Sequence, residues 1–217
     1  SYFENVHFEN NSAIIGGAAS FRFGSSCELN NCAFTNNTST SRAGAVTVNY
    51  GSNVILNNSV FTKNKTKGNG GAIWVDDQAS QYGGTKPVIS NCVFTENSAK
   101  FYGGAIHNYN IATTVIQNCT FKKNSAQFGN DIANTLRCQV TISNPGNSIT
   151  NIFNDESSSV SETSGQNIEK KGLEPSEKTV NSNTSTQTLD NIDFSVTIIG
   201  SGSPVYNPER SQPSALV

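Results

Sequence analysis

The sequence has 217 residues, of which 14% are charged, and its formal net charge at neutral pH is −2. This balance excludes a strongly basic surface for nucleic acid, and no apolar run is long enough for a transmembrane helix. We therefore expect no nucleic-acid partner and no membrane span, and a length that allows one domain or a domain with a tail.

Residues 1–143 repeat a unit of about 27 residues, and equivalent positions carry the same type of side chain. Each unit is headed by an asparagine: Asn5, Asn31, Asn58, Asn91, Asn118 and Asn144. An aromatic column follows: Phe8, Phe34, Phe61, Phe94 and Phe121. A second asparagine column comes next: Asn11, Asn37, Asn64, Asn97 and Asn124. A small-residue turn rich in glycine and alanine then closes each unit, at residues 16–18, 43–45, 70–72 and 103–105 and, in degraded form, at 129–131.

The units read in chain order as coils at residues 1–26, 27–53, 54–86, 87–113 and 114–143. Short β-branched runs such as residues 54–56, bounded by turn residues, are typical of strands. The pattern predicts an all-β fold: a parallel β-helix of about five three-sided coils, in which the phenylalanines and asparagines stack as ladders. A β-sandwich is the alternative, but it gives no reason for the shared register.

The third coil is longer than its neighbours, and the excess falls at residues 76–85. An insertion in one repeat maps to a loop on one face, which is often the binding face. The candidate binding residues on this face are Trp74, Asp76, Asp77, Tyr82, His107 and Tyr109. The alternative for Trp74 and His107 is an ordinary, half-exposed position in the stack.

Catalysis is not expected. Asp76 and Asp77 are the only adjacent acidic pair among the coils, and neighbouring strand residues point to opposite faces. His7 and His107 have no partnered serine or cysteine pattern, and no spacing fits a metal site. We expect no catalytic residue, metal or cofactor.

The five cysteines leave two alternatives open. Cys32, Cys92 and Cys119 share one column, with Ser59 in the remaining coil, whereas Cys27 and Cys138 lie off it. The column can be a stack of small buried side chains, or Cys92 and Cys119 can form a disulfide.

Sequons for N-glycosylation occur in several coils. Asn37 and Asn64 are expected to point inward, so the candidates for glycosylation are Asn10, Asn36 and Asn57.

A paired motif, Phe-x-x-Asn and then Gly-Gly-Ala-Ile, is complete at residues 94–97 with 103–106 and again at 61–64 with 70–73. It resembles the paired motif of the chlamydial polymorphic outer-membrane protein repeats, which is similar to repeats of archaeal adhesin-like proteins and protist surface proteins. The resemblance covers about residues 1–148. It implies a right-handed parallel β-helix that is exposed outside the cell and often adhesive.

The register ends after Asn144, which predicts a β-helix at residues 1–148 and a polar, extended tail at 149–217 with a strand near 190–199. We expect an extracellular or cell-surface protein of structural or adhesive function that associates end to end into a fibre. The alternative is a monomeric adhesin that binds host glycan or a surface protein through the 76–85 loop face. A polysaccharide-active enzyme is the third candidate.

Overall fold

The computed structural model describes residues 1–77, 83–143, 149 and 151–162, all within the first of two compact units, Ser1–Glu177 and Lys178–Val217. Every regular element among these residues is a β-strand, and they form no helix that could cross a membrane. The predicted strand near 190–199 lies outside the described residues.

The strands form four sheets, which we name A to D. Sheet A contains β1 (Tyr2–Glu4), β5 (Ser26–Asn30), β9 (Asn53–Asn57), β13 (Val88–Ser90), β17 (Thr113–Gln117), β20 (Gln139–Ser143) and β22 (Ser159–Glu162). Sheet B contains β2 (His7–Glu9), β6 (Ala33–Thr35), β10 (Val60–Thr62), β14 (Val93–Thr95) and β18 (Thr120–Lys122). Sheet C contains β3 (Ser12–Ile15), β7 (Thr38–Arg42), β11 (Lys65–Thr66) and β15 (Ser98–Ala99). Sheet D contains β4 (Ala19–Phe21), β8 (Val46–Asn49), β12 (Ile73–Asp76), β16 (Ile106–Tyr109), β19 (Ile132–Thr135) and β21 (Ile152–Asn154).

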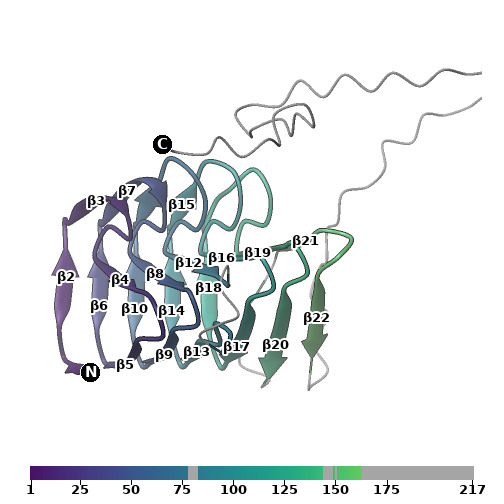
Figure 1. Ribbon diagram of the computed structural model, residues 1–217. Helices are drawn as coiled ribbons and strands as arrows, with labels where there is room; N and C mark the ends of the chain where they lie inside the picture. Colours follow the sequence, from purple (N-terminus) through teal and green to yellow (C-terminus); the bar gives the residue numbers. More distant parts are fainter. Residues whose placement is uncertain (78–82, 144–148, 150, 163–217) are drawn as a thin grey trace, which may run out of the picture. The chain divides into compact units, whose positions relative to one another are not determined.

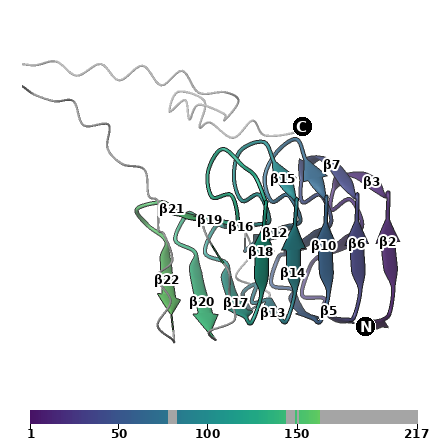
Figure 2. The ribbon, with the colours of Figure 1, turned by 180° about the vertical axis from the view of Figure 1, so that it is seen from behind.

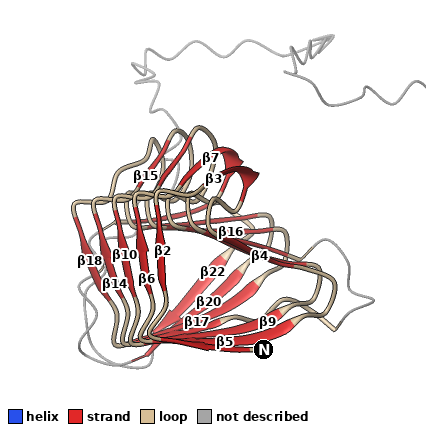
Figure 3. Cartoon of the chain, turned by 90° about the vertical axis from the view of Figure 1, so that its left-hand side faces the viewer, coloured by secondary structure: helices blue, strands red, loops and turns tan. Residues whose placement is uncertain are grey.

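Neighbouring strands in each sheet are parallel and come from consecutive coils, so the chain winds as a solenoid (Figures 1 and 3). The predicted parallel β-helix is therefore confirmed. The prediction of three-sided coils is wrong, because each of the first four coils contributes a strand to all four sheets. The extra corner falls at the second asparagine column, which separates sheet B from sheet C.

The interior is filled by side chains that repeat once per coil. The strands of sheet B lie side by side in Figure 2. Their phenylalanines, Phe8, Phe34, Phe61, Phe94 and Phe121, are paired in register, and successive ring centroids lie 4.6–4.9 Å apart. In sheet A the apolar column runs from Phe3 through Leu29 to Ile142. These columns bury a continuous apolar core along the stack, which is the main favourable term for folding.

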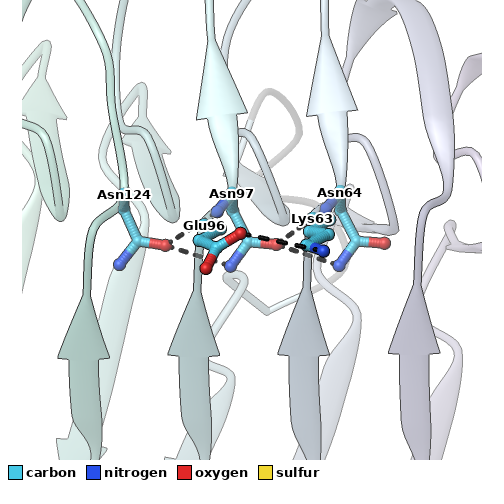
Figure 4. Close-up of polar contacts among 5 residues, drawn as sticks. All are labelled: Lys63, Asn64, Glu96, Asn97 and Asn124. Atoms are coloured by element: carbon cyan, nitrogen blue, oxygen red, sulfur yellow. Dashed lines mark hydrogen bonds and ion pairs between the residues drawn. The ribbon is translucent and has the colours of Figure 1, made fainter.

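The second asparagine column forms a buried ladder at the corner between sheets B and C (Figure 4). The side-chain amide of Asn64 donates to the Asn97 side-chain oxygen at 3.0 Å and to the Phe34 carbonyl at 2.9 Å. The Asn64 backbone N–H donates to the same Asn97 oxygen. Asn37 and Asn97 repeat this pattern, so the corner satisfies its buried polar groups entirely within the stack.

The head asparagines lie at the corner between sheets A and B, where the backbone takes a left-handed conformation. Asn5, Asn31, Asn58, Asn91 and Asn118 all have positive φ, between 49° and 58°. Asparagine is among the few non-glycine residues that tolerate this left-handed conformation, which explains why it recurs there. Asn144 lies outside the described residues.

The small-residue turn is required by close approach between coils. A Cβ on Gly71 would lie 1.9 Å from the Gly104 carbonyl oxygen, and one on Gly44 would lie 2.2 Å from that of Gly71. A side chain there would push these coils apart, so the first four coils keep glycine at this position.

All five cysteines are buried and none forms a disulfide, which decides between the two alternatives for their column. Cys32, Cys92 and Cys119 pack as small side chains in the core, and Ser59 in the same column accepts a hydrogen bond from the Cys32 N–H at 3.0 Å. Burial raises the pKa of the Cys138 thiol to about 12, so this thiol stays protonated and unreactive.

The stack continues beyond the boundary expected at residue 148. Strand β21 pairs in parallel with β19, and β22 pairs with β20, so sheet D extends to Asn154 and sheet A extends to Glu162. The start of the polar segment is therefore part of the β-helix, because Ile152 and Val160 fill the positions below Ile132 and Val140.

The asparagine ladder can be tested with Asn64→Ala. This substitution leaves the buried N–H groups of Asn37 without their acceptor and removes the donor to the Phe34 carbonyl. We expect the free energy of unfolding to fall by about 2–4 kcal/mol, measured by urea denaturation. Lys65→Ala, at the adjacent exposed position, should change it by less than about 0.5 kcal/mol; equal losses would contradict a structural role for the ladder.

Candidate functional site: an aromatic groove on sheet D

The outer face of sheet D carries side chains that are buried although they point away from the core. In β12, Ile73 and Val75 belong to the core, so Trp74 and Asp76 point outward by strand alternation. Trp74 is nevertheless only 2% exposed and Asp76 is fully buried, and the next coil buries His107, the partner of Trp74. A second layer must therefore cover this face.

That layer is built by the residues immediately before each small-residue turn: Arg42, Asn69, Tyr102 and Phe128. They are linked in register by bridges between Arg42 and Asn69 and between Tyr102 and Phe128. The Arg42 guanidinium lies 4.6 Å from the Trp74 ring centroid, and the Tyr102 ring stacks on His107 at 5.4 Å. We call the space between this row and the outer residues of sheet D the aromatic groove.

A pocket of about 300 Å³ lies at the later coils of the groove. Its lining combines rings with polar groups: Asn69, Tyr102, His107, Tyr109, Thr135, Leu136, Phe153 and Asp155. Tyr102 contacts the rings of both Phe128 and Phe153, at 5.1 and 5.7 Å between centroids. Leu136, one of the lining residues, is 46% exposed. Such a concave, mostly apolar site with a few polar groups is typical of small-ligand binding.

His107 presents a neutral imidazole to the groove. Burial, together with the nearby Arg42 cation, lowers its pKa to about 3, so the ring is uncharged at physiological pH. Its Nε2 atom hydrogen bonds to the Thr135 hydroxyl at 3.0 Å. Its Nδ1 atom is buried and has no hydrogen-bond partner among the described residues.

Asp76 is the second unusual group on this face. Its carboxylate oxygens make no well-aligned hydrogen bond in the described part of the chain, although the Asn110 side chain and the Asp77 N–H lie near enough to favour the charged form. Burial outweighs both and raises the pKa of Asp76 to about 7. The carboxyl is therefore protonated in a large fraction of molecules at neutral pH. Neighbouring Asp77 is different, since its carboxylate oxygen accepts a hydrogen bond from the Thr85 hydroxyl at 3.3 Å.

Other buried polar atoms on this side of the stack are also unpaired. The Trp74 indole N–H and the side-chain oxygens of Asn49 and Asn69 have no protein partner within the described residues. Each such atom costs roughly 1–3 kcal/mol when it is buried without a hydrogen bond. Their concentration on one face needs an explanation, and groups that bind a polar ligand provide one.

Four of the predicted candidate residues lie together on this face: Trp74, Asp76, His107 and Tyr109. The half-exposed alternative for Trp74 and His107 is wrong, because the row of residues before the turns covers both rings. Asp77 is tied to Thr85, and Tyr82 lies outside the described residues. Sequence reasoning missed the covering row (Arg42, Asn69, Tyr102 and Phe128), whose members share a fixed place before each small-residue turn but no common side-chain chemistry.

Asp155 lines the pocket, but its carboxylate oxygens are occupied. One accepts the Leu136 N–H at 2.6 Å and the other accepts both the N–H and the hydroxyl of Ser157. These hydrogen bonds lower the pKa of Asp155 despite partial burial. Asp155 therefore serves as a structural acceptor that holds the turn of the last described coil.

The glycosylation candidates differ in their surroundings. Asn10 and Asn36 are exposed, with φ of 57° and 54°, at the position before the buried ladder. Asn57 is half-buried, and its side-chain oxygen accepts a hydrogen bond from Asn91 at 2.9 Å. Glycosylation at any of them stays a prediction, and the structure offers Asn10 and Asn36 with the freer side chains.

Comparison with known protein families adds one finding. A family described as the right handed beta helix region matches residues 1–144. The chain belongs to the right-handed β-helix family. The predicted handedness of the coil is thereby confirmed, and no curated protein and no solved structure matches this β-helix. The family is defined by its fold and includes enzymes and non-enzymes, so membership leaves the function to be argued from the groove.

The raised pKa of Asp76 predicts a pH dependence of stability. The folded protein holds this proton up to about pH 7, whereas the unfolded chain releases it near 3.8, so the contribution of Asp76 to stability is lost as pH rises between these values. Asp76→Asn should raise the free energy of unfolding by about 1–3 kcal/mol at pH 8, measured by urea denaturation. At pH 4 the two proteins should be nearly equal, and a gain of the same size at both pH values would disprove the assignment.

Proposed function

We propose that this β-helix is a structural or adhesive protein of the cell exterior that binds carbohydrate in the aromatic groove. The observation that carries the proposal is the combination of stacked rings with unpaired polar atoms along one face. The resemblance of the Phe-x-x-Asn and Gly-Gly-Ala-Ile motifs to polymorphic outer-membrane protein and adhesin repeats supports the same function and location.

The chemistry of the groove suits a sugar. A pyranose ring has an apolar face of C–H bonds, which packs on an aromatic ring, and hydroxyls that both donate and accept hydrogen bonds. The exposed part of Tyr102 and Tyr109 offers the rings, while the Asn69 oxygen and His107 Nδ1 offer polar partners. A segment of a surface protein is the alternative ligand, and it would use the same rings.

The stack supports binding by holding the groove rigid. The groove residues sit on parallel strands whose register is fixed by the interior ladders, so little conformational entropy is lost when a ligand binds. A rigid, repetitive scaffold with variable outer columns is suited to presenting a binding face away from a surface.

Binding in the groove can be measured on an array of neutral glycans with the full chain. We expect Tyr102→Ala to weaken binding of any captured glycan about tenfold, since it removes the ring at the centre of the pocket. Leu136→Trp should have a similar effect by filling part of the pocket without removing a core residue.

Tyr2→Ala is the matched control, because Tyr2 is an exposed ring on sheet A. It should leave glycan binding unchanged. Equal loss in Tyr2→Ala, or undiminished binding by Leu136→Trp, would count against the groove, and a wild-type chain that captures no glycan would count against carbohydrate as the ligand.

Self-association end to end is the second candidate function. Within the described residues, β1, β2, β3 and β4 each pair on one side only, and Phe3 and Ile14 beside that edge are 39% and 71% exposed. An open edge of this kind accepts further strands readily. The contribution expected from the tail lies outside the described residues.

Light scattering at micromolar concentration tests this second candidate. We expect elongated oligomers of the full chain, and we expect Phe3→Lys with Ile14→Lys to shift the population to monomers, because charges at the edge oppose strand addition. A wild-type chain that remains monomeric would remove the fibre from consideration.

A further inference from the structure

The outer face of sheet C is the second distinctive surface of the described residues, and it is basic. Ser39, Thr66 and Ala99 are the buried residues of this sheet, so the residues on either side of them point outward. These outward positions include Lys65, Lys67 and Lys100, all of which are exposed. We call this surface the lysine face.

The lysine face is hollowed rather than flat. One depression of about 380 Å³ is lined by Lys65, Thr66, Lys67, Ser98, Ala99 and Lys100. A second, of about 400 Å³, is lined by Ser12, Thr38, Ser39, Thr40, Lys65 and Lys67. The two share Lys65 and Lys67, so hydroxyls and ammonium groups line one continuous track across β3, β7, β11 and β15.

The charges on this track are not balanced by neighbouring acids. Lys63–Glu96, at 3.9 Å, is the one ion pair among the described residues, and it lies at the corner beside the track (Figure 4). Lys100 contacts the ring of Phe101, with its Nζ atom 4.8 Å from the centroid, and not a carboxylate. Lys122 and Lys123 add further positive charge at the end of β18.

The fold itself does not need these lysines. The column of Lys65 carries Ser12, Thr38 and Ser98 in the other coils. Lys67 follows Thr66 and Lys100 follows Ala99, and these two buried residues are paired in register on β11 and β15. The two lysines therefore lie in adjacent coils, with like charges close together. Like charges side by side on a sheet are destabilising, which means that the cluster lowers stability unless an anion binds to it.

We propose that the lysine face binds an acidic polysaccharide, carrying carboxylate or sulfate groups, along the direction of the stack. Strands repeat every ~4.8 Å along this direction, which is about the length of one sugar unit, so the charges of the polymer and the lysines can run in step. Serine and threonine hydroxyls between the lysines provide hydrogen bonds to sugar hydroxyls.

Nucleic acid and anionic membrane fit this surface less well. The formal net charge of −2 leaves the lysine face without the broad positive field that phosphate polymers require. The track itself is lined by hydroxyls and lysines, and so it lacks the row of rings that stacks bases and the apolar side chains that enter a bilayer.

The test uses the full chain and a triple variant, Lys65→Ser, Lys67→Thr and Lys100→Gln. Each replacement is an uncharged polar residue of the kind found in the same columns of other coils, so the fold should be retained. We expect the wild type to bind immobilised alginate and dextran sulfate in a salt-sensitive manner, and any binding to neutral dextran to be the same in the wild type and the variant. The triple variant should bind about tenfold or more weakly, as the loss of three charge pairs implies.

The matched control removes the same charge elsewhere, with Arg22→Ser, Lys86→Ser and Arg137→Ser at exposed positions. Unchanged binding by this control supports the lysine face, and a loss equal to that of the triple variant overturns it. Tighter binding to duplex DNA or to phosphatidylserine vesicles than to both polysaccharides also overturns it. Capture of neutral glycans in the aromatic groove should be the same in all three proteins, so the two sites fail independently.

Discussion

The whole molecule depends on one constraint: side chains that recur once per coil must lie directly above one another. The buried asparagines impose it chemically, because the oxygen of each one accepts from both the backbone and the side-chain N–H of the asparagine in the preceding coil. A shift of one residue would break every one of these bonds and would turn the phenylalanines out of the core. Register is therefore specified at each coil.

This constraint frees the outer columns. Because the interior side chains hold the coils together, the residue types at outward positions can vary without loss of the fold. Outward residues of successive coils lie side by side, so they form an extended surface along the stack. Two surfaces of this protein arise in this way: a row of residues before the turns that covers Trp74 and His107, and a group of lysines on sheet C.

The sequence was sufficient for the interior because its columns use rare agreements of residue type, such as Phe61 above Phe34 and Asn64 above Asn37. It was insufficient where a column varies in chemistry. Arg42, Asn69 and Tyr102 share a position but no property, so their common role in covering sheet D emerges only from the fold. The strands β21 and β22 were missed for a related reason, since they continue the stack without the phenylalanine and asparagine motif.

Buried polar groups on the two sides of sheet D show why the groove is more than a by-product of folding. On the inner side, the Asn108 amide donates to Asn134 at 2.7 Å and that of Asn134 donates to Asn154 at 2.6 Å, so the polar interior is satisfied. On the outer side, the Trp74 N–H, the Asp76 carboxyl and His107 Nδ1 are equally buried and are not satisfied by the described residues. The same strands of sheet D thus carry paired polar side chains on the inner face and unpaired ones on the outer face. A sequence that pairs its inner amides so completely has the means to pair the outer ones, and their unpaired state is the physical basis for assigning a ligand to that face.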